Sequence, residues 1–305
     1  MARLSWIALP EEVRSAIGAA LQGPVTSVHE KTGGFTSSLA ASCTLADGRL
    51  VFVKAASRDE SPVSAAMMQR EVDVANALGE RFPGPDLLSV LQSGSWLATI
   101  FEHVPGEMPF IPWRQDELAA ALDALHRLSS VVLEEGILEN LSDHYAGAFG
   151  GWDRIASSDL RKQVDEWIVA NLDRLIELEA QWSEAAAGSS LVHGDLRSDN
   201  MIRKPDGDIT FVDWSDGCRG VGWFDLLAML PSAQLEGAGK AESIFCSSEL
   251  GRIADQHHVN VVLAAVAAFF VSRSLLPPPA EAPTVRDFQR VQGEVAVSWL
   301  RERIG

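Results

Sequence analysis

The chain has 305 residues, of which 47% are hydrophobic, and it carries a formal net charge of −17. This length and apolar content predict a substantial buried core divided between two subdomains. The negative charge argues against nucleic acid as a partner. The cysteines Cys43, Cys218 and Cys246 are odd in number and far apart, which indicates reduced thiols rather than a disulfide framework.

The sequence gives no sign of secretion or of membrane insertion. The first residues lack a basic start followed by a long apolar run, so we expect no secretory signal. The most apolar segment, residues 259–271, is too short to span a bilayer and is typical of a core helix. We therefore expect a cytoplasmic protein without a membrane partner.

Residues 28–54 predict three β-strands with a glycine-containing loop between the first two. We expect strands over residues 28–31, 39–45 and 50–54, and Asp47-Gly48 is a typical hairpin turn between the last two. Glycine lets backbone N–H groups approach a phosphate because no Cβ lies in the way. Taken alone, the loop is equally compatible with an ordinary hairpin connection. Its candidate phosphate contacts are Gly33, Gly34, Thr36, Ser37 and Ser38.

A lysine at the end of an apolar strand is the next candidate. Lys54 closes the strand Leu-Val-Phe-Val-Lys, and such a lysine needs a carboxylate partner. Residues 65–78 predict a helix, and Glu71 lies beside the apolar positions of this helix. Asp73 is the competing carboxylate, and Glu71 as a solvated helix residue is the alternative interpretation. We favour a Lys54–Glu71 pair.

A fourth recognisable strand covers residues 96–101, and Glu102-His103-Val104-Pro105-Gly106 ends it. The chain beyond is predicted to be mostly helical, with amphipathic or apolar patterns followed by a break at three prolines, 277–279. The expected helices cover residues 117–132, 159–182, 224–230, 253–276 and 285–303.

Two motifs carry the chemistry. Val-His-Gly-Asp-Leu-Arg-Ser-Asp-Asn places Asp195 five residues before Asn200, and Phe-Val-Asp-Trp places Asp213 thirteen residues further on. Phosphoryl transfer from a nucleotide needs such a set, because one carboxylate accepts the proton of the acceptor hydroxyl while a carboxamide and a second carboxylate hold metal on the phosphates. Singly, Asn200 could be a turn or cap residue and Asp213 a polar strand end.

Together these motifs resemble the aminoglycoside phosphotransferase and choline kinase family, which is related to the protein kinases. The family pattern is His-Gly-Asp, an asparagine five residues later, and then an Ile/Val-Asp-Trp/Phe segment, and this sequence matches every position. The resemblance implies an α+β, protein-kinase-like fold with a five-stranded antiparallel sheet and one main helix in the first lobe, and a larger helical second lobe. It implies ATP and Mg²⁺ as cofactors.

The resemblance also implies roles for individual residues. Asp195 would be the catalytic carboxylate, Asn200 and Asp213 the metal ligands, and Lys54 the lysine on the α- and β-phosphates. Glu102 would offer its carbonyl and Val104 its amide to the adenine ring, in a hinge over residues 102–106. The nucleotide lobe would then cover residues 1–101, and the catalytic and acceptor lobe residues 107–305.

Three further residues near the catalytic loop have implied roles. His193 stands where kinase-like folds place a loop-shaping histidine, and Asp225 resembles the buried aspartate that accepts backbone N–H groups of the catalytic loop. Arg197 departs from the histidine found in many aminoglycoside kinases. We favour an Arg197 contact to the transferred phosphate. A surface pair with Asp199 is the alternative.

The expected function is ATP-dependent phosphorylation of a hydroxyl group on a small molecule. Residues 1–105 have a net charge of −3 and residues 106–305 a net charge of −14, which weakly favours a cationic acceptor over a merely solvated acidic surface. Our first choice is an antibiotic, either aminoglycoside-like or a nucleoside or macrolide, so that the protein confers resistance. A metabolic kinase for an amino alcohol, a sugar or a homoserine-like metabolite is the alternative, and a silent nucleotide-binding module is less favoured. We expect a monomer or homodimer.

Overall fold

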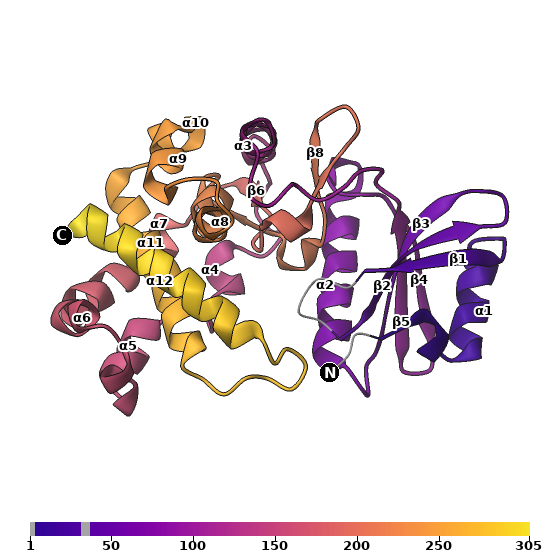
Figure 1. Ribbon diagram of the computed structural model, residues 1–305, viewed down its shortest axis with the longest axis horizontal. Helices are drawn as coiled ribbons and strands as arrows, with labels where there is room; N and C mark the ends of the chain where they lie inside the picture. Colours follow the sequence, from indigo (N-terminus) through magenta and orange to yellow (C-terminus); the bar gives the residue numbers. More distant parts are fainter. Residues whose placement is uncertain (1–3, 32–36) are drawn as a thin grey trace.

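The computed structural model describes residues 4–31 and 37–305. Its N-terminal part is a five-stranded antiparallel sheet in the order β1-β2-β3-β5-β4, which Figure 1 shows to the right of the helical part. The hairpin turn predicted at Asp47-Gly48 connects β2 and β3, with Gly48 at φ 87°. The five strands are β1 (Val25–Glu30), β2 (Leu39–Leu45), β3 (Leu50–Ser57), β4 (Leu87–Ser93) and β5 (Trp96–Glu102).

The two faces of this sheet are covered by two helices. Alternate side chains of a strand point to opposite faces, so Val51, Val53 and Ala55 pack with α1 (Glu11–Ala20), which the sequence analysis did not anticipate. On the other face Ala56 packs against α2 (Pro62–Leu78) through Ala65 and Met68. Lys54 shares the α2 face, which is why its side chain meets that helix.

The chain leaves the sheet along the second lobe and is held there by a backbone ladder. Glu107 exchanges two hydrogen bonds with Arg203, at 3.2 and 2.8 Å, on the hairpin of β7 (Met201–Arg203) and β8 (Ile209–Phe211). Gly106, at φ 141°, permits this approach, because a Cβ there would lie 2.1 Å from the carbonyl oxygen of Arg203. A second small sheet pairs β6 (Ser190–Val192) with β9 (Cys218–Gly220).

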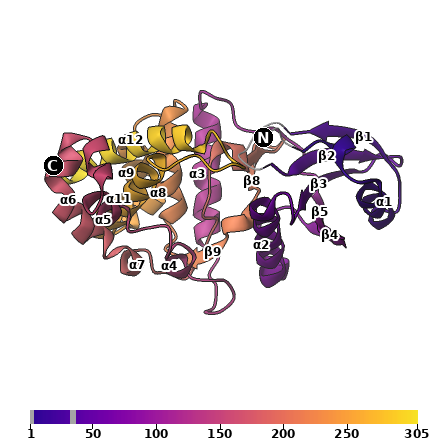
Figure 2. The ribbon, with the colours of Figure 1, turned by 90° about the horizontal axis from the view of Figure 1, so that it is seen from below.

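Helices make up most of the second lobe, and Figure 2 shows them gathered on the side away from the sheet. Their shared core is a large cluster of buried apolar side chains that includes Trp152, Leu263 and Leu300. The helices are α3 (Gln115–Ser129), α4 (Leu141–His144), α5 (Gly151–Ala156), α6 (Glu166–Glu179), α7 (Trp182–Ala185), α8 (Phe224–Leu235), α9 (Ala241–Ser247), α10 (Glu249–Ile253), α11 (Gln256–Ser274) and α12 (Val285–Ile304).

Helix α11 is the central helix of this lobe. Its 19 residues extend beyond the apolar segment 259–271, and by length and composition alone it could cross a membrane. Length therefore does not distinguish a membrane-spanning helix from a core helix. Within the fold, 56% of the most apolar 18-residue stretch of α11 is buried. Ten side chains of this helix, from Val259 to Ser272, are buried. Helix α11 is thus a core helix of this lobe.

The single helix predicted over residues 159–182 is wrong. The structure has a short 3₁₀ segment, η3 (Asp159–Gln163), then α6 and α7. The break occurs because Asp165 caps a new helix, with its Oδ1 accepting the Trp167 amide at 2.8 Å. The apolar spacing continues across this cap, which is why periodicity alone joined the segments. The cysteines are free thiols, with Cys43 and Cys218 buried and Cys246 exposed.

Candidate active site

The predicted Lys54–Glu71 pair forms at the junction of the lobes. Lys54 Nζ lies 2.9 and 2.8 Å from the two carboxylate oxygens of Glu71 on α2, and 3.0 Å from Asp213 Oδ1 in the second lobe. The Lys54 side chain is 14% exposed and that of Glu71 4%. Burial opposes the charge on Lys54, but the two carboxylates outweigh it and raise the pKa of this lysine.

Asp213 is held in an unusual backbone conformation. It follows β8 with φ 68° and ψ 63°, a left-handed geometry that few non-glycine residues adopt. The 3₁₀ turn η5 (Trp214–Asp216) begins directly after it, and the Trp214 amide donates to Glu71 at 3.4 Å. The Lys54 ammonium lowers the pKa of Asp213, so its carboxylate stays ionised. Strained backbone of this kind is common at functional sites.

The catalytic loop is shaped by a glycine and by hydrogen bonds to its backbone. Gly194 precedes Asp195 at φ 86°, and a Cβ there would lie 2.5 Å from the Asp216 carbonyl oxygen. Asn200 donates from Nδ2 to the Asp195 carbonyl at 2.7 Å. Asn200 ends the 3₁₀ turn η4 (Ser198–Asn200). The loop is therefore closed on itself, and Asp195 lines a cavity with its side chain 41% exposed.

Asp225 anchors this loop from the first turn of α8, as the resemblance implied. Its two carboxylate oxygens accept the amides of His193 and Gly194 at 2.7 and 2.9 Å. His193 is fully buried, and its Nε2 lies 3.0 Å from the Val212 carbonyl oxygen. Burial lowers the pKa of His193, so the ring is neutral at neutral pH. Both residues are buried and support the catalytic loop from the protein interior.

Arg197 contacts the two aspartates on either side of it. Its Nη1 lies 2.5 Å from Asp195 Oδ1, and its Nε and Nη2 lie 3.0 and 3.2 Å from the carboxylate of Asp199. The side chain is 16% exposed. The pair with Asp199 that the alternative predicts is present, with the Arg197 side chain largely buried, and the contact of Arg197 with the transferred phosphate stays a prediction. Arg197 therefore holds the carboxylate of Asp195 through its Oδ1 oxygen.

The environment of Asp195 favours its protonated form. Burial at the base of the cleft is the main cause, and the charges of Asp216 and Asp213 add to it against the opposing effect of Arg197; together they raise the pKa of Asp195 to about 7. The side chain keeps 41% of its surface open to the cleft, so water screens part of this effect. A carboxylate with a pKa near neutrality can accept a proton at working pH.

The other predicted nucleotide contacts are in part outside the described residues. Gly33, Gly34 and Thr36 lie in the segment 32–36, of which nothing is described. Ser37 and Ser38 are buried just before β2. Ser37 Oγ lies 2.9 Å from Ser61 Oγ and 3.5 Å from Glu281 Oε2, so this end of the loop touches the segment between α11 and α12.

The hinge candidates lie where the first lobe ends. Glu102 is the last residue of β5, and its amide donates to the Asp86 carbonyl at 2.8 Å. Val104 is half-buried two residues later, in a stretch without regular secondary structure. Both positions lie where β5 ends and the chain passes to the second lobe, and their contact with adenine stays a prediction.

Asn200 and Asp213 fit a hard divalent cation. The Asn200 carboxamide is oriented by its bond from Nδ2, which leaves its oxygen for a ligand, and Asp213 uses only Oδ1 in its pair with Lys54. Two oxygen ligands are what magnesium needs from a protein when phosphates and water supply the rest. Within residues 4–31 and 37–305 no cluster of three or more His, Cys, Asp or Glu side chains forms a metal site, so the all-protein cage of a structural metal is not present there.

Several residues of this site were missed by the sequence analysis. Tyr145 donates from its hydroxyl to the Gly194 carbonyl at 2.9 Å, and Asp216 Oδ1 accepts from His144 Nε2 at 3.0 Å. Tyr145 and Asp216 line a cavity beside Asp195 together with residues of α11 and α12. Of these residues, only Asp216 lies close in sequence to a predicted site residue, three positions after Asp213. The other residues come from distant helices.

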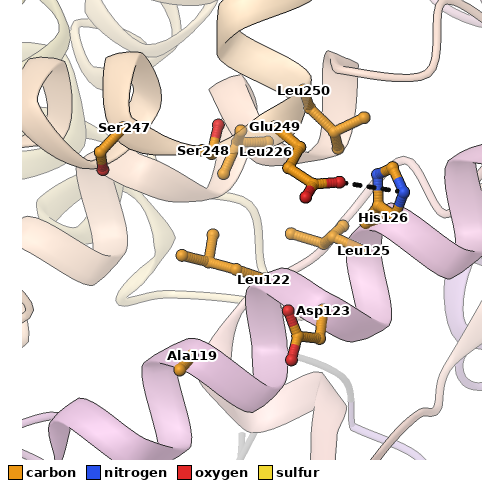
Figure 3. A pocket seen from close by; sticks show the side chains of 10 residues that line it. All are labelled: Ala119, Leu122, Asp123, Leu125, His126, Leu226, Ser247, Ser248, Glu249 and Leu250. Carbon is orange, nitrogen blue, oxygen red and sulfur yellow. Dashed lines mark ion pairs between the residues drawn. The ribbon is translucent and has the colours of Figure 1, made fainter.

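A separate hollow lies between α3, α8 and α10 of the second lobe (Figure 3). It is lined by Leu122 and His126 of α3, Leu226 of α8 and Glu249 of α10, and His126 Nε2 lies 3.2 Å from Glu249 Oε2. Both partners of this pair are about half exposed or more, at 48% and 64%. None of the residues around Lys54 or Asp195 lines this hollow, so it is not part of the candidate active site.

Comparison with known proteins agrees with the motifs. A family model described as "Phosphotransferase enzyme family" matches residues 36–255, and a search of curated proteins found no match. Aminoglycoside phosphotransferase APH(4)-Ia, solved with ADP and hygromycin B, superposes with a TM-score of 0.63 at 15% identity, covering 96% of this chain and 99% of that one.

Two alcohol kinases are as similar in fold. Choline kinase LicA from Streptococcus pneumoniae has a TM-score of 0.63 at 12% identity, covering 96% of this chain and 98% of that one. Plasmodium vivax ethanolamine kinase has a TM-score of 0.60 at 13% identity, with coverages of 91% and 83%. The expected two-lobed, kinase-like α+β fold is thereby confirmed. The chain belongs to the phosphotransferase enzyme family, and like its members it is an ATP-dependent small-molecule kinase.

Proposed function

We propose that the protein transfers the γ-phosphoryl group of ATP to a hydroxyl group of a small molecule, with Asp195 as the residue that orients this hydroxyl and accepts its proton. The observation that carries the proposal is the convergence of three side chains from distant parts of the sequence. Lys54 of β3, Glu71 of α2 and Asp213 after β8 form one ion-paired group, and the Asp195 loop lies next to it in the same cleft.

Each charged or polar residue of the site has a separate role in this proposal. Lys54, kept positive by Glu71 and Asp213, neutralises phosphate charge and fixes the nucleotide. Arg197 stabilises charge on the transferred group while it holds Asp195 in place. Asn200 and Asp213 hold magnesium, which neutralises charge on the phosphate oxygens when bound. Because little covalent chemistry is asked of the protein, the rate comes from positioning and electrostatics.

The nucleotide is proposed to bind between the lobes. Residues 1–101 form the nucleotide lobe, residues 102–106 the hinge and residues 107–305 the catalytic and acceptor lobe. Glu102 and Val104 meet the adenine through their main chain, and Gly33, Gly34, Thr36, Ser37 and Ser38 cover the phosphates. Support comes from the end of β5 at Glu102, where the chain passes to the second lobe, and from the buried Ser37 and Ser38 at the end of the loop.

For the acceptor we propose an antibiotic, aminoglycoside-like or a nucleoside or macrolide, so that phosphorylation confers resistance. The similarity to an aminoglycoside kinase solved with hygromycin B supports this choice. The equal similarity to a choline kinase and to an ethanolamine kinase favours, as a second candidate, a metabolic kinase for a small alcohol.

The test is ATP turnover, with magnesium, across a library of hydroxylated antibiotics and metabolites, with each product identified by mass. We expect one acceptor class to gain a single phosphoryl group and expression of the protein to protect a sensitive bacterium if that acceptor is a drug. Phosphorylation of a metabolite without any protection would exclude the resistance proposal and favour the second candidate.

A further inference from the structure

The cavity beside Asp195 has an aromatic wall. It has a volume of about 290 Å³, near the lower end of typical ligand pockets. Five of its residues form a continuous series of ring contacts, with centroid distances of 5.5, 6.2, 5.3 and 6.4 Å from one ring to the next. We call this series the aromatic belt: Tyr145, Phe149, Phe269, Phe270 and Phe288.

The belt runs from the catalytic loop around the cavity and back to it. At one end the Tyr145 hydroxyl is bonded to the Gly194 carbonyl, and at the other the Arg197 guanidinium lies 5.4 Å from the centre of the Phe288 ring. Phe269 and Phe270 are on α11, and Phe288 is on α12. A molecule that presents a hydroxyl to Asp195 therefore has its body against aromatic side chains.

The charged groups of the cavity are already hydrogen-bonded within the protein. Arg197 lies between Asp195 and Asp199, and Asp216 is bonded to His144 and to the Ser215 hydroxyl at 2.9 Å. Asp195 itself is needed for the acceptor hydroxyl. Among the residues that line the cavity, no further carboxylate remains to receive an ammonium group of an acceptor.

The acidic character of the second lobe is located elsewhere. The segment 134–184 is rich in acidic residues, yet it contributes only Tyr145 and Phe149 to the cavity wall. Residues 231–305 contribute neutral side chains to it, among them Val266, Gln289 and Gln292. The net charge of the lobe therefore says little about the chemistry at the acceptor site.

A buried carboxamide adds a polar group to this cavity wall. Gln292 of α12 lines the cavity and is 2% exposed, and its carboxamide forms no hydrogen bond with the residues that the structure describes. Its neighbour Gln289 differs, because its Oε1 accepts from Arg286 at 2.8 Å. Water or a ligand in the cavity can satisfy this amide. A carboxamide can pair with an uncharged oxygen or nitrogen, whereas it cannot balance a charge.

We infer that this cavity selects an uncharged alcohol with a bulky, apolar, ring-bearing body, held by the aromatic belt and by one hydrogen bond to Gln292, rather than a polycationic acceptor. The inference rests on the proposed function, since it takes Asp195 to be the residue that meets the acceptor hydroxyl. It narrows the acceptor classes considered above to those without several positive charges.

Direct binding tests the inference without requiring turnover. Naphthylethanol serves as the uncharged aromatic probe, and hygromycin B and choline as the cationic probes, each titrated calorimetrically into the full chain at low and high salt. We expect naphthylethanol to bind with a Kd that does not change with salt and with a negative heat-capacity change. Phe269→Ala should weaken its binding about tenfold. The matched control Phe110→Ala, an exposed ring elsewhere, should leave it unchanged.

A charge substitution tests the role of Gln292. Gln292→Glu keeps the size of the side chain but adds a carboxylate, so it should weaken naphthylethanol about tenfold and strengthen choline at low salt. Gln181→Glu adds the same charge at an exposed position between α6 and α7, outside the cavity wall, and should change neither. Tighter binding of hygromycin B or choline than of naphthylethanol by the unmodified protein, no binding of naphthylethanol, or equal binding by Phe269→Ala would overturn the inference.

The same protein, assayed for ATP turnover with all three probes, separates this inference from the proposed function. If naphthylethanol binds as described but no acceptor is phosphorylated, the kinase proposal fails while the cavity assignment stands. If hygromycin B is phosphorylated and naphthylethanol does not bind, the kinase proposal stands while the cavity assignment fails.

Discussion

The phosphate end and the acceptor end of the active site differ in the chemical character of their side chains. At the phosphate end Lys54 lies within about 3 Å of two opposite charges, those of Glu71 and Asp213. At the acceptor end the wall consists of the aromatic belt and a neutral carboxamide. The charged end depends on fixed geometry, so it tolerates little change. The apolar end depends on volume and shape, so its acceptor can be altered by substitution without loss of the phosphoryl-transfer residues.

The largest effect is expected from removing a proposed metal ligand at the charged end. Asp213→Ala should abolish magnesium-dependent turnover, because the phosphates and Asn200 alone cannot complete an octahedral set of oxygen ligands. Turnover is measured over a range of magnesium concentrations, with a chelator added to the unmodified protein as the control. Full activity of Asp213→Ala, or chelator-resistant activity of the unmodified protein, would contradict the metal assignment.

The ion pair offers a second way to separate function from stability. Lys54→Met should stop turnover and lower the free energy of unfolding by about 3 kcal/mol, because Glu71 stays buried without its cation. The double variant Lys54→Met with Glu71→Leu should recover most of this stability in urea unfolding but none of the turnover. Recovery of turnover in the double variant would show that the pair serves the fold alone.

The pH dependence of kcat/KM tests whether Asp195, between the phosphate end and the acceptor end, is the base. With the pKa of Asp195 raised to about 7, kcat/KM should fall about tenfold between pH 8 and pH 6, because only the ionised carboxylate accepts a proton. The measurement is the pH profile of kcat/KM with acceptor as the varied substrate. A profile flat from pH 8 down to pH 5 would remove Asp195 as the titrating base.

The same raised pKa has a consequence for stability. Because the folded state binds this proton more tightly than the unfolded chain, the protonated carboxyl stabilises the fold below about pH 4 and that contribution is lost as pH rises through about 7. Asp195→Asn should therefore unfold at a higher temperature than the unmodified protein at pH 8. The difference should vanish toward pH 4, which thermal unfolding at both pH values can check.

The smallest effect is expected where the aromatic belt joins the catalytic loop. Tyr145→Phe removes the hydrogen bond to the Gly194 carbonyl while keeping the ring, so we expect a loss of about 1 kcal/mol in unfolding free energy. Turnover should fall only a few-fold, since Asp225 still holds the loop from below. A fall of a thousandfold would mean that Tyr145 takes part in the chemistry.

The sequence was informative where the site is local. Asp195, Asn200 and Asp213 lie within nineteen positions of one another, and their spacing predicted the loops that bring them together. The Lys54–Glu71 pair was accessible because a strand lysine and the following helix are consecutive elements. The residues of the acceptor wall were not predictable, because Tyr145, Phe269 and Gln292 meet only through packing of α11 and α12. In the sequence, Phe269 looks like any core residue of an apolar helix.

Charge was the least instructive feature. The negative net charge of residues 106–305 weakly favoured a cationic acceptor, whereas the cavity wall is largely aromatic, with Asp195, Arg197 and Asp216 as its charged residues. Acidic side chains such as Glu177 and Glu184 are on exposed surfaces of the helical lobe, where they keep the protein solvated. A segment's composition averages over all its faces, whereas a ligand meets only one of them.

The central claim is that Asp195 accepts the proton of an acceptor hydroxyl that receives the γ-phosphoryl group of ATP. The most direct test follows ADP and phosphorylated acceptor together, by chromatography and mass, in the unmodified protein and in Asp195→Asn. We predict equal amounts of the two products from the unmodified protein, and turnover lower by about two to four decades in the variant with unchanged nucleotide affinity. The same phosphorylated product formed by Asp195→Asn within about twofold of the unmodified rate would contradict the claim.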